Sequence, residues 1–514
     1  MVEAVDDSKA LKALYKQSRP NQRIRLGALQ VQLHASGTVY REKAEVTLEF
    51  TPDCYLQLRL PKPAGGVRSW LVLGRNWDLR ITVPGSDTEF QAHLRRATVH
   101  GSRRPSGLAR PKPVAYAPGY ETNTPGQSTA PSAGAGAGAA RKRSPRRLEQ
   151  GATFDVDGPI IPTAAAAPLS SAIGHIFNLP DLRAALLDGG GWKVEIRRAD
   201  PADKPSPQLK DTGGYLLTHA AELTRKDGSE FSDKELSDAL ECLHWFLSFG
   251  FGGRVGVGPV VAYDTARAMV WQQWGLSACA RGALDGVPCC FDRLHPEILS
   301  GVWPGFRRLW ADTRWNQPLR HLLDWYLRAN EGKLGLETGI ILAPVALDLL
   351  AWMYCVHVRA TTVREEFKKK PAAERFRLLA SGLELPLTFP PSCGQLEKHD
   401  GLRAGAGGAP WDPMTAITRV RNSLVHPDPA QTFWPLEVYT QARNLALWYV
   451  EISILRLCGH NGNYANRLCL PHWTGAVEPV PFPQAPTALA KSAGAYASAV
   501  GCPLPPADQR GPLP

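Results

Sequence analysis

The sequence predicts an α+β protein, with an antiparallel β-rich N-terminal domain that contains a disordered insertion and an all-α helical bundle toward the C-terminus. From residue 23 to 100, apolar and polar residues alternate with a period of two, which is typical of half-buried strands. Residues 101–166 consist mainly of Pro, Gly, Ala, Ser and Arg, and this composition cannot bury enough apolar surface to fold. From residue 318 onward, apolar residues recur at helical spacing.

The β-rich domain is predicted to span 23–265, after a short N-terminal segment at 1–22. Beyond the insertion, strand patterns resume at 191–197, 215–219 and 255–263. Between them, Ser232 and Glu235 form a capping box that opens a helix ending near 249. We therefore interpret 101–166 as an insertion within one β-rich domain, and a linker between two domains is the less favoured interpretation.

A connecting region at 266–317 is expected to lead into a helical bundle at 318–475. A Pro/Ala-rich tail at 476–514 is predicted to be disordered. Several candidate helices with turn residues between them are typical of an antiparallel bundle. These helices are predicted at 318–329, 335–358, 361–381, 413–426 and 435–458.

The net charge of +11 is unevenly distributed along the chain. Residues 101–150 hold nine Arg or Lys against two Glu, which accounts for seven of the eleven positive charges. The remainder is nearly balanced, so the overall charge does not by itself indicate nucleic-acid binding. The ten cysteines include no CxxC pair and no zinc-finger spacing. This pattern favours reduced thiols in a cytoplasmic protein without a metal or cofactor, and no secretory signal is evident.

One stretch, 339–358, is long and apolar enough to be considered as a membrane span. Asp348 lies in its middle and Pro344 interrupts it, and a carboxylate at a helix centre costs about 3 kcal/mol in lipid. A helix buried in the bundle therefore explains the pattern better, and no membrane association is expected.

The most informative feature is the segment Arg421-Asn422-Ser423-Leu424-Val425-His426, followed by Pro427. Asp412 is a good helix N-cap, Pro413 suits the first helical position, and apolar residues then recur at helical spacing. The segment therefore places a guanidinium, a carboxamide and an imidazole near the end of one helix. A cation that can hold a phosphate, beside a group that moves protons near neutral pH, can support RNA cleavage without a metal.

This segment resembles the Arg-x4-6-His signature of HEPN ribonucleases, in its common Arg-Asn-x3-His form. The spacing alone recurs three more times in the chain, so the Asn after the Arg makes the resemblance specific. The resemblance covers about 318–475. Together with the β-rich domain, the layout is similar to ApeA-type abortive-infection proteins, although the long basic insertion departs from that layout.

The resemblance implies a metal-independent endoribonuclease that acts as a toxin or phage-defence effector and cleaves RNA by attack of the 2′-hydroxyl. Arg421, Asn422 and His426 would form the catalytic group. RNA would be the substrate, a homodimer would form through the bundle, and a phage-derived trigger would bind the β domain. The alternative interpretation is a non-catalytic HEPN bundle that binds nucleic acid or a protein partner.

Five further residues are candidates for supporting roles. Arg419 lies on the same side of the predicted helix as Asn422 and His426. Asp348 lies in an apolar stretch, where a buried carboxylate needs a partner, and an Arg or His of the motif helix is the obvious one. The equally weighted alternative is an Asp at the helix edge that faces water or forms a structural ion pair. The polar cluster after the last helix could line the site or could be a fixed turn. Its candidates are Asn463, Tyr464 and Arg467.

Overall fold

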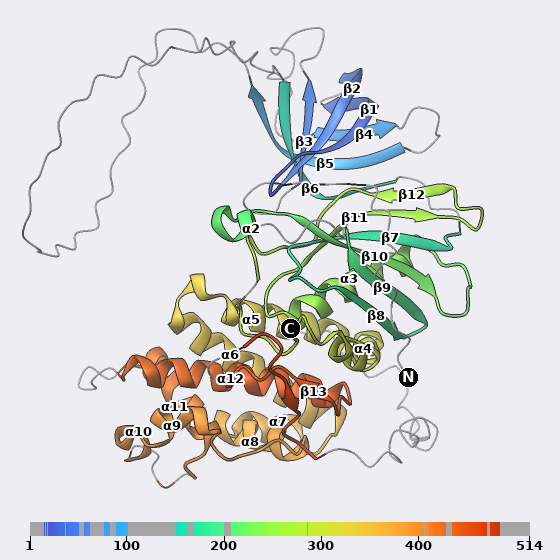
Figure 1. Cartoon of the computed structure of the whole chain (residues 1–514). Coiled ribbons are helices and arrows are strands. Elements are labelled where there is room, and N and C mark those ends of the chain that lie inside the picture. Colours follow the sequence, from blue (N-terminus) through green and yellow to red (C-terminus); the bar gives the residue numbers. More distant parts are fainter. Residues whose placement is uncertain are drawn as a thin grey trace, which may run out of the picture.

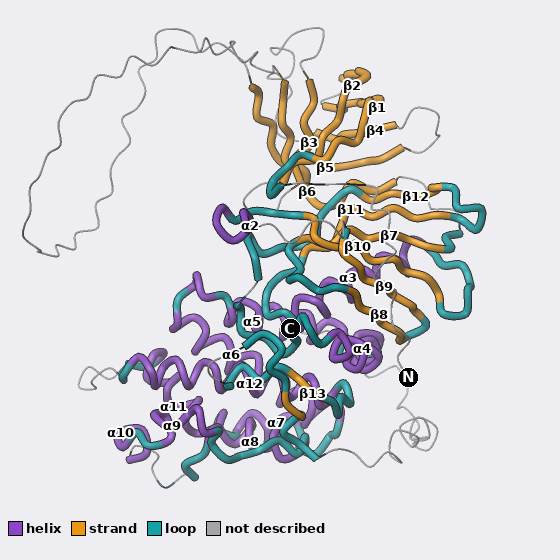
Figure 2. The backbone as a smooth tube through the Cα atoms, viewed as in Figure 1, coloured by secondary structure: helices purple, strands orange, loops and turns teal. Residues whose placement is uncertain are grey.

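The protein is seen here as a computed structural model, in which a β-barrel, a six-stranded sheet and a group of helices follow one another (Figure 1). The predicted α+β class is confirmed, and Figure 2 shows the strands in one half and the helices in the other. The predicted insertion at 101–150 and the tail beyond 483 lie outside the described residues. The structure describes residues 15, 17, 19–35, 38–50, 56–61, 77–82, 89–100, 151–162, 168–199, 207–284, 286–404, 408, 410–427, 434–469 and 473–483.

The first β unit is a closed antiparallel barrel with strand order β1-β2-β3-β6-β5-β4. The last strand corrects the predicted extent of the insertion, because residues 151–162 pair with both β3 and β5 and close the barrel. The predicted single β-rich domain is therefore two β units. The barrel strands are β1 (Ile24–Ala35), β2 (Thr38–Phe50), β3 (Leu56–Pro61), β4 (Trp77–Thr82), β5 (Glu89–His100) and β6 (Gly151–Pro162).

Residues that precede the barrel in sequence contact the second β unit. The Gln17 side chain accepts a hydrogen bond from the Leu217 backbone N–H at 2.8 Å, and Asn21 accepts one from the Tyr215 N–H at 3.0 Å. Tyr15 is buried among residues of the same unit. The barrel is thus an insertion into the second β unit, and the predicted N-terminal segment at 1–22 contributes residues to that unit.

The second β unit is an antiparallel sheet with strand order β12-β11-β7-β10-β9-β8. Helix α3 (Asp233–Gly250) begins at the predicted capping box, with Ser232 accepting from the Glu235 N–H. A short helix, α2 (Pro207–Thr212), precedes β10. The strands are β7 (Ser171–Phe177), β8 (Ala184–Gly189), β9 (Trp192–Arg198), β10 (Leu217–Arg225), β11 (Gly256–Tyr263) and β12 (Met269–Gln273).

Helices dominate the described residues after β12, and they begin earlier in the sequence than predicted. The predicted connecting region at 266–317 contains β12 and the long helix α4 (Pro296–Ala311), which packs on β8. Pro371 separates α7 from α8, where one helix was predicted. The helices after α4 are α5 (Asn316–Asn330), η1 (Gly332–Leu334), α6 (Leu336–Trp352), η2 (Met353–Val358), α7 (Arg364–Lys369), α8 (Ala372–Gly382), η3 (Pro391–Cys393), α9 (Gly394–Glu397), α10 (Asp400–Ala404), α11 (Pro413–Val425) and α12 (Leu436–Leu457).

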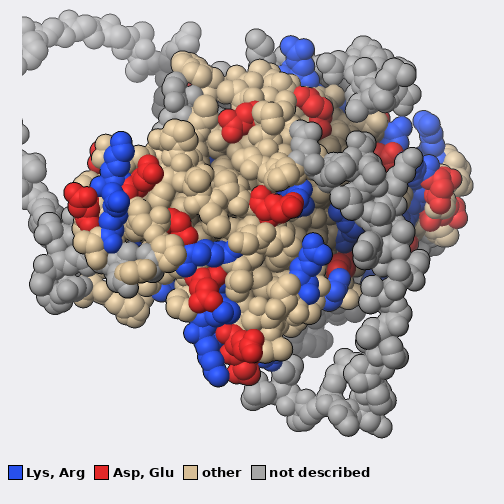
Figure 3. Space-filling view, turned by 90° about the horizontal axis from the view of Figure 1, so that it is seen from below, with Lys and Arg blue, Asp and Glu red and all other residues tan. Residues whose placement is uncertain are grey.

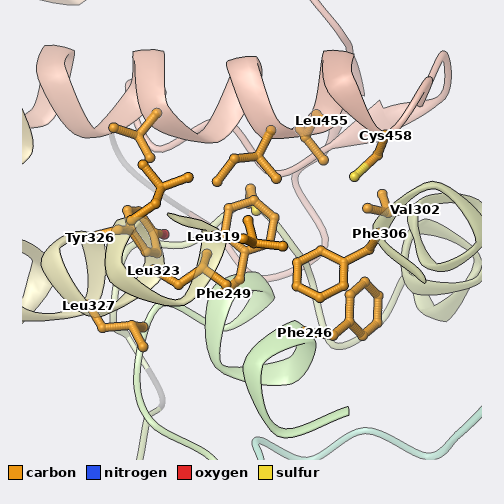
Figure 4. Packing of buried hydrophobic residues seen from close by; sticks show 14 of the residues in the cluster. Phe246, Phe249, Val302, Phe306, Leu319, Leu323, Tyr326, Leu327, Leu455 and Cys458 are labelled. Carbon is orange, nitrogen blue, oxygen red and sulfur yellow. The ribbon is translucent and has the colours of Figure 1, made fainter. Parts of the chain in front are cut away.

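One hydrophobic core joins the central sheet to the helices. Figure 4 shows α3, α4, α5 and α12 contributing side chains to it. The rings of Phe246 on α3 and Phe306 on α4 lie 5.2 Å apart, and Phe249 lies 5.7 Å from Tyr326 on α5. Because aromatic side chains bury large areas, these contacts fix the helices against the sheet unit.

Helix α6 and the π-helix η2 form one segment, Leu336–Val358, that is long and apolar enough to cross a membrane. Of its 18-residue apolar stretch, 61% is buried inside the protein, as expected for a helix in a hydrophobic core. It packs against α5, α12, α11 and α8. The segment thus lies inside the helical group, as the sequence predicted for 339–358.

Candidate functional site at the end of helix α11

Helix α11 carries the predicted catalytic residues, and local interactions explain where it begins. The Asp412 side chain accepts a hydrogen bond from the Thr415 N–H at 2.8 Å, and Pro413 occupies the first turn. Since a free N–H of the first turn is satisfied in this way, the helix has a defined start. Its apolar face is buried in the core at Met414, Ile417 and Val420.

The helix ends at the motif, as the sequence predicted. His426 has φ −128° and ψ 70°, outside the helical region, and its N–H donates to the Asn422 carbonyl at 2.8 Å. Pro427 follows, and a residue before proline is disfavoured in the helical conformation. His426 and Asn422 are exposed, so the imidazole and the carboxamide stand at the surface.

Two arginines lie beside these exposed groups. Arg421 and Arg419 are half-buried on α11. The Arg421 Nη1 donates a hydrogen bond to the Asn422 Oδ1 at 3.0 Å. This contact uses one of the five N–H donors of the guanidinium, and it holds the Arg421 head group next to the carboxamide. Three of the predicted residues are therefore brought together at one helix end.

Asp348 on α6 lies near Arg421, but its direct partner is another residue. Its Oδ2 lies 3.1 Å from Nη1 of Arg375 on α8. Burial raises the pKa of Asp348, and the positive charges of Arg375 and then Arg421 oppose that rise. Of the two interpretations that the sequence left open for Asp348, the structure therefore shows the ion pair, with a partner on α8 and not on the motif helix. Arg375 forms the ion pair, and Arg421 acts on the carboxylate electrostatically.

Two further contacts hold α11 in place. On α8, Arg377 forms an ion pair with Asp412, its Nε donating to Oδ2 at 2.5 Å. At the other end, the Trp434 Nε1 donates to the Ser423 Oγ at 3.0 Å, so the start of α12 lies beside the motif. The sequence did not identify Arg375, Arg377 or Trp434 as contacts of the site. Their roles depend on the partners that they meet in the folded chain.

The cluster after the last long helix lies elsewhere. Arg467 is buried, and its guanidinium pairs with Glu451 in the middle of α12. Its Nη1 also donates to the Asn330 Oδ1 at 3.1 Å. A guanidinium enclosed in this way cannot reach a phosphate at the surface, which corrects the supporting role expected for Arg467.

Asn463 and Tyr464 form the short strand β13 (Asn463–Tyr464), which pairs with β14 (Glu478–Pro479). The Tyr464 hydroxyl is buried and accepts a hydrogen bond from the Trp448 Nε1 at 2.9 Å. This strand follows the C-terminal end of α12, whereas the motif lies at the end where α12 begins. Neither residue lines the candidate site, and the cluster is the fixed turn that the sequence left as its other interpretation.

The charges around the site are of both signs. Figure 3 shows Lys and Arg side chains next to Asp and Glu on the face of the helical part seen from below. Among the described residues, no group of three or more His, Cys, Asp or Glu side chains could hold a metal ion.

Comparison with known proteins gives two family matches. The family model described as the YopA C-terminal domain matches residues 312–478, which contain α5 to β13, and the YopA central domain matches 165–283, which contain the six-stranded sheet and α3. The SPbeta prophage-derived uncharacterized protein YopA of Bacillus subtilis (strain 168) is 28% identical over 297 residues, 57% of this chain and 64% of that protein. The chain thus spans less than two thirds of that relative's length. No solved structure matches. The chain is therefore similar to YopA in its central sheet and in its helical part.

Proposed function

We propose that the chain is a metal-independent endoribonuclease of HEPN type, with its site at the exposed end of α11. The observation that carries the proposal is the placement of Arg421, Asn422 and His426 at one end of α11. The Arg421 guanidinium contacts the Asn422 carboxamide, and the exposed His426 is the C-cap of the same helix. A guanidinium that can donate hydrogen bonds to a phosphate and an imidazole that can transfer protons thus lie at the same helix end.

Each residue has a defined role in this proposal. The RNA 2′-oxygen forms a bond to the adjacent phosphorus while the bond from phosphorus to the 5′-oxygen breaks. His426 accepts the proton of the 2′-hydroxyl and returns it to the leaving 5′-oxygen, as an imidazole within reach of both oxygens can. Arg421 stabilises the charge on the phosphate oxygens, and Asn422 orients the guanidinium. The products are a 2′,3′-cyclic phosphate and a free 5′-hydroxyl.

A second copy of the chain is proposed to complete the site. Helix α6 is apolar around most of its circumference, yet Ile341, Val345 and Leu349 are only half-buried. A helix that is apolar on all sides is normally enclosed, so a partner surface is expected there. Asp348 lies on the same helix beside Arg421, so a copy docked on this side would lie next to the motif.

The biological setting is part of the proposal. The chain would act in the cytoplasm as a toxin or phage-defence effector. The relative from Bacillus subtilis is described as prophage-derived, which supports a role in conflict between phages and their hosts. The β units would bind the phage-derived trigger.

A second candidate function has an observation in its favour. Asn422 and His426 stand exposed at the helix end, and a surface of this kind can also serve as a contact. The chain would then be a non-catalytic bundle that binds nucleic acid or a protein partner.

Cleavage of a labelled RNA by the purified full chain separates the two candidates. Arg421→Ala and His426→Ala should each abolish cleavage while keeping the wild-type thermal midpoint. Matched controls are Arg403→Ala on α10 and His357→Ala in η2, both exposed positions outside the motif. Cleavage that survives in either motif variant would refute the ribonuclease, and binding without cleavage in the wild type would favour the second candidate.

A further inference from the structure

A tryptophan lies against the flank of the motif helix. Trp434 stands just before α12, and its Nε1 donates a hydrogen bond to the Oγ of Ser423, the residue after Asn422. At about 100° per residue, Ser423 and Arg421 lie on opposite flanks of α11, with Asn422 between them. Trp434 and Arg421 therefore border the exposed part of the motif from two sides.

Contacts with α10 and with the segment before it hold this indole in one orientation. The backbone of Gly401 on α10 packs on the six-membered ring, because a Cβ added to Gly401 would lie 3.1 Å from the Trp434 Cζ3. The His399 ring meets the indole edge to face, with the two centroids 4.9 Å apart. Since these contacts and the bond to Ser423 fix the ring, a ligand that touches its remaining surface does not have to order it.

Part of the indole stays at the surface, and apolar surface continues beyond it. Trp434 is half-buried, Pro435 is exposed, and Leu436 in the first turn of α12 is 67% exposed. Asn422 and His426 of the motif are exposed as well. A fixed aromatic ring beside a polar, cationic helix end suits a ligand that joins a planar ring to an anionic group, as a nucleotide does.

We propose that Trp434 binds an unpaired base of the RNA substrate next to the scissile phosphate. The proposal rests on the ribonuclease function proposed above and adds a base subsite to it. The base stacks on the accessible part of the indole while the phosphate lies at Arg421. Every base has a π face, so the subsite accepts all four bases. Bases within a duplex are already stacked on their neighbours, so the subsite selects unpaired segments.

Binding of short RNAs to the full chain tests the subsite. The His426→Ala background keeps the RNA intact, and the two probes are an oligoadenylate and an abasic ribose-phosphate oligomer of the same length. The oligoadenylate should bind at least about tenfold more tightly than the abasic oligomer, because only the oligoadenylate can stack. Trp434→Ala should remove most of this difference and leave the affinity for the abasic oligomer unchanged.

Two further variants separate stacking from a structural role. Trp434→Phe keeps an aromatic face without the bond to Ser423, so its affinity for oligoadenylate should stay within about threefold of that of the parent chain. Trp473→Ala, which removes a tryptophan that is 69% exposed beyond the other end of α12, should bind both probes as the parent does. Equal losses of affinity for oligoadenylate in Trp434→Phe and Trp434→Ala would overturn stacking. So would a loss in Trp434→Ala that is the same for both probes.

Cleavage kinetics distinguish failure of the subsite from failure of the ribonuclease. In the chain that retains His426, Trp434→Ala should lower kcat/KM for an unpaired RNA by about tenfold or more. Cleavage with wild-type kcat/KM in Trp434→Ala would overturn the subsite and leave the ribonuclease standing. Base-dependent binding that requires Trp434, without cleavage by the wild type, would overturn the ribonuclease and keep the subsite.

Discussion

The Asp348 carboxylate on α6 lies 3.1 Å from the Arg375 guanidinium on α8, and the charge of Arg421 on α11 reaches the same carboxylate. Three helices that are well separated in sequence therefore meet at one acidic group. The Oδ1 of Asp348 is buried and has no hydrogen-bond partner among the described residues. Asp348 thus connects the motif helix to its neighbours through electrostatics, with one oxygen still able to accept a bond.

Replacing Asp348 with Asn should separate a role in the site from a role in stability. The Asp348 side chain is 37% exposed, and ion pairs of that exposure contribute at most about 1 kcal/mol, so the free energy of unfolding should change little. RNA cleavage should fall by about tenfold or more if the carboxylate positions Arg421. Cleavage kinetics and thermal melts measure both quantities. Glu365→Gln, on the exposed face of α7, is the control, and equal cleavage by both variants would remove Asp348 from the site.

The buried pair of Arg467 and Glu451 should behave as a structural element. Arg467→Met leaves the Glu451 carboxylate buried without its partner, which should lower the free energy of unfolding by about 3–5 kcal/mol. The double variant with Glu451→Leu should lose less, because no unpaired charge remains. Denaturant unfolding measures both. A single variant as stable as the wild type would contradict the placement of this pair in the core.

The central sheet unit should make stability depend on pH in the acidic range. Burial lowers the pKa of His175, His219 and His244 to about 4 in each case, below the ordinary value of 6.5. Between these values the unfolded chain binds protons that the folded chain does not. The contribution of these residues to stability is therefore complete above pH 6.5 and is lost as the pH falls toward 4.

His244→Asn is the variant that tests this dependence. The Asn side-chain amide can donate a hydrogen bond to the Val255 carbonyl in place of the His244 Nδ1, so the variant should keep the fold. Between pH 6.5 and 4, the free energy of unfolding of the variant should decline less steeply than that of the wild type, by the equivalent of one proton. The exposed His321→Asn is the matched control. Parallel pH profiles for the wild type and His244→Asn would show that His244 titrates normally.

Gly305 on α4 should not tolerate a side chain. A Cβ at this position would overlap the carbonyl oxygen of Cys458, at the end of α12. Gly305→Ala should therefore destabilise the fold by about 2 kcal/mol or more, since the backbone must move to admit a methyl group. Gly332→Ala is the control, because nothing lies within 4 Å of its added Cβ. Equal thermal midpoints for the two variants would contradict the close packing of α4 on α12.

Local signals in the sequence predicted the elements that depend on neighbours along the chain. The capping box at Ser232 and Glu235 opens α3, and Asp412 with Pro413 opens α11. The end of α11 at His426 followed from Pro427. These features were predictable because a cap, a proline and the spacing of apolar residues act over a few residues.

Helix α4 and strand β6 are among the elements that the sequence did not predict, because their composition resembles that of loops. Helix α4 contains Pro304 in its interior, and a proline within an apolar repeat normally indicates the end of a helix. Strand β6 follows a long Pro/Gly/Ala-rich stretch and itself contains Gly158 and Pro159, so its composition resembles that of the insertion. Its pairing with β3 and β5 involves residues far away in sequence, and no local pattern reveals such partners.

The sequence predicted the part of the site that lies on helix α11, but not the partners that other helices contribute. Arg421, Asn422 and His426 share a helix end, so their proximity follows from helical geometry. Arg375 as the partner of Asp348 and Glu451 as the partner of Arg467 depend on packing between helices. An arginine in a polar turn and an arginine enclosed in a core look the same in sequence until the acidic partner is placed.

The central claim is that the α11 motif cleaves RNA, and mapping RNA ends in cells tests it most directly. The wild type and His426→Ala would be induced in a bacterial host, and the new 3′ ends in total RNA would be sequenced with a method specific for cyclic phosphates. The account predicts new cyclic-phosphate ends with the wild type and none with His426→Ala at equal protein levels. The same new ends in both strains would contradict it.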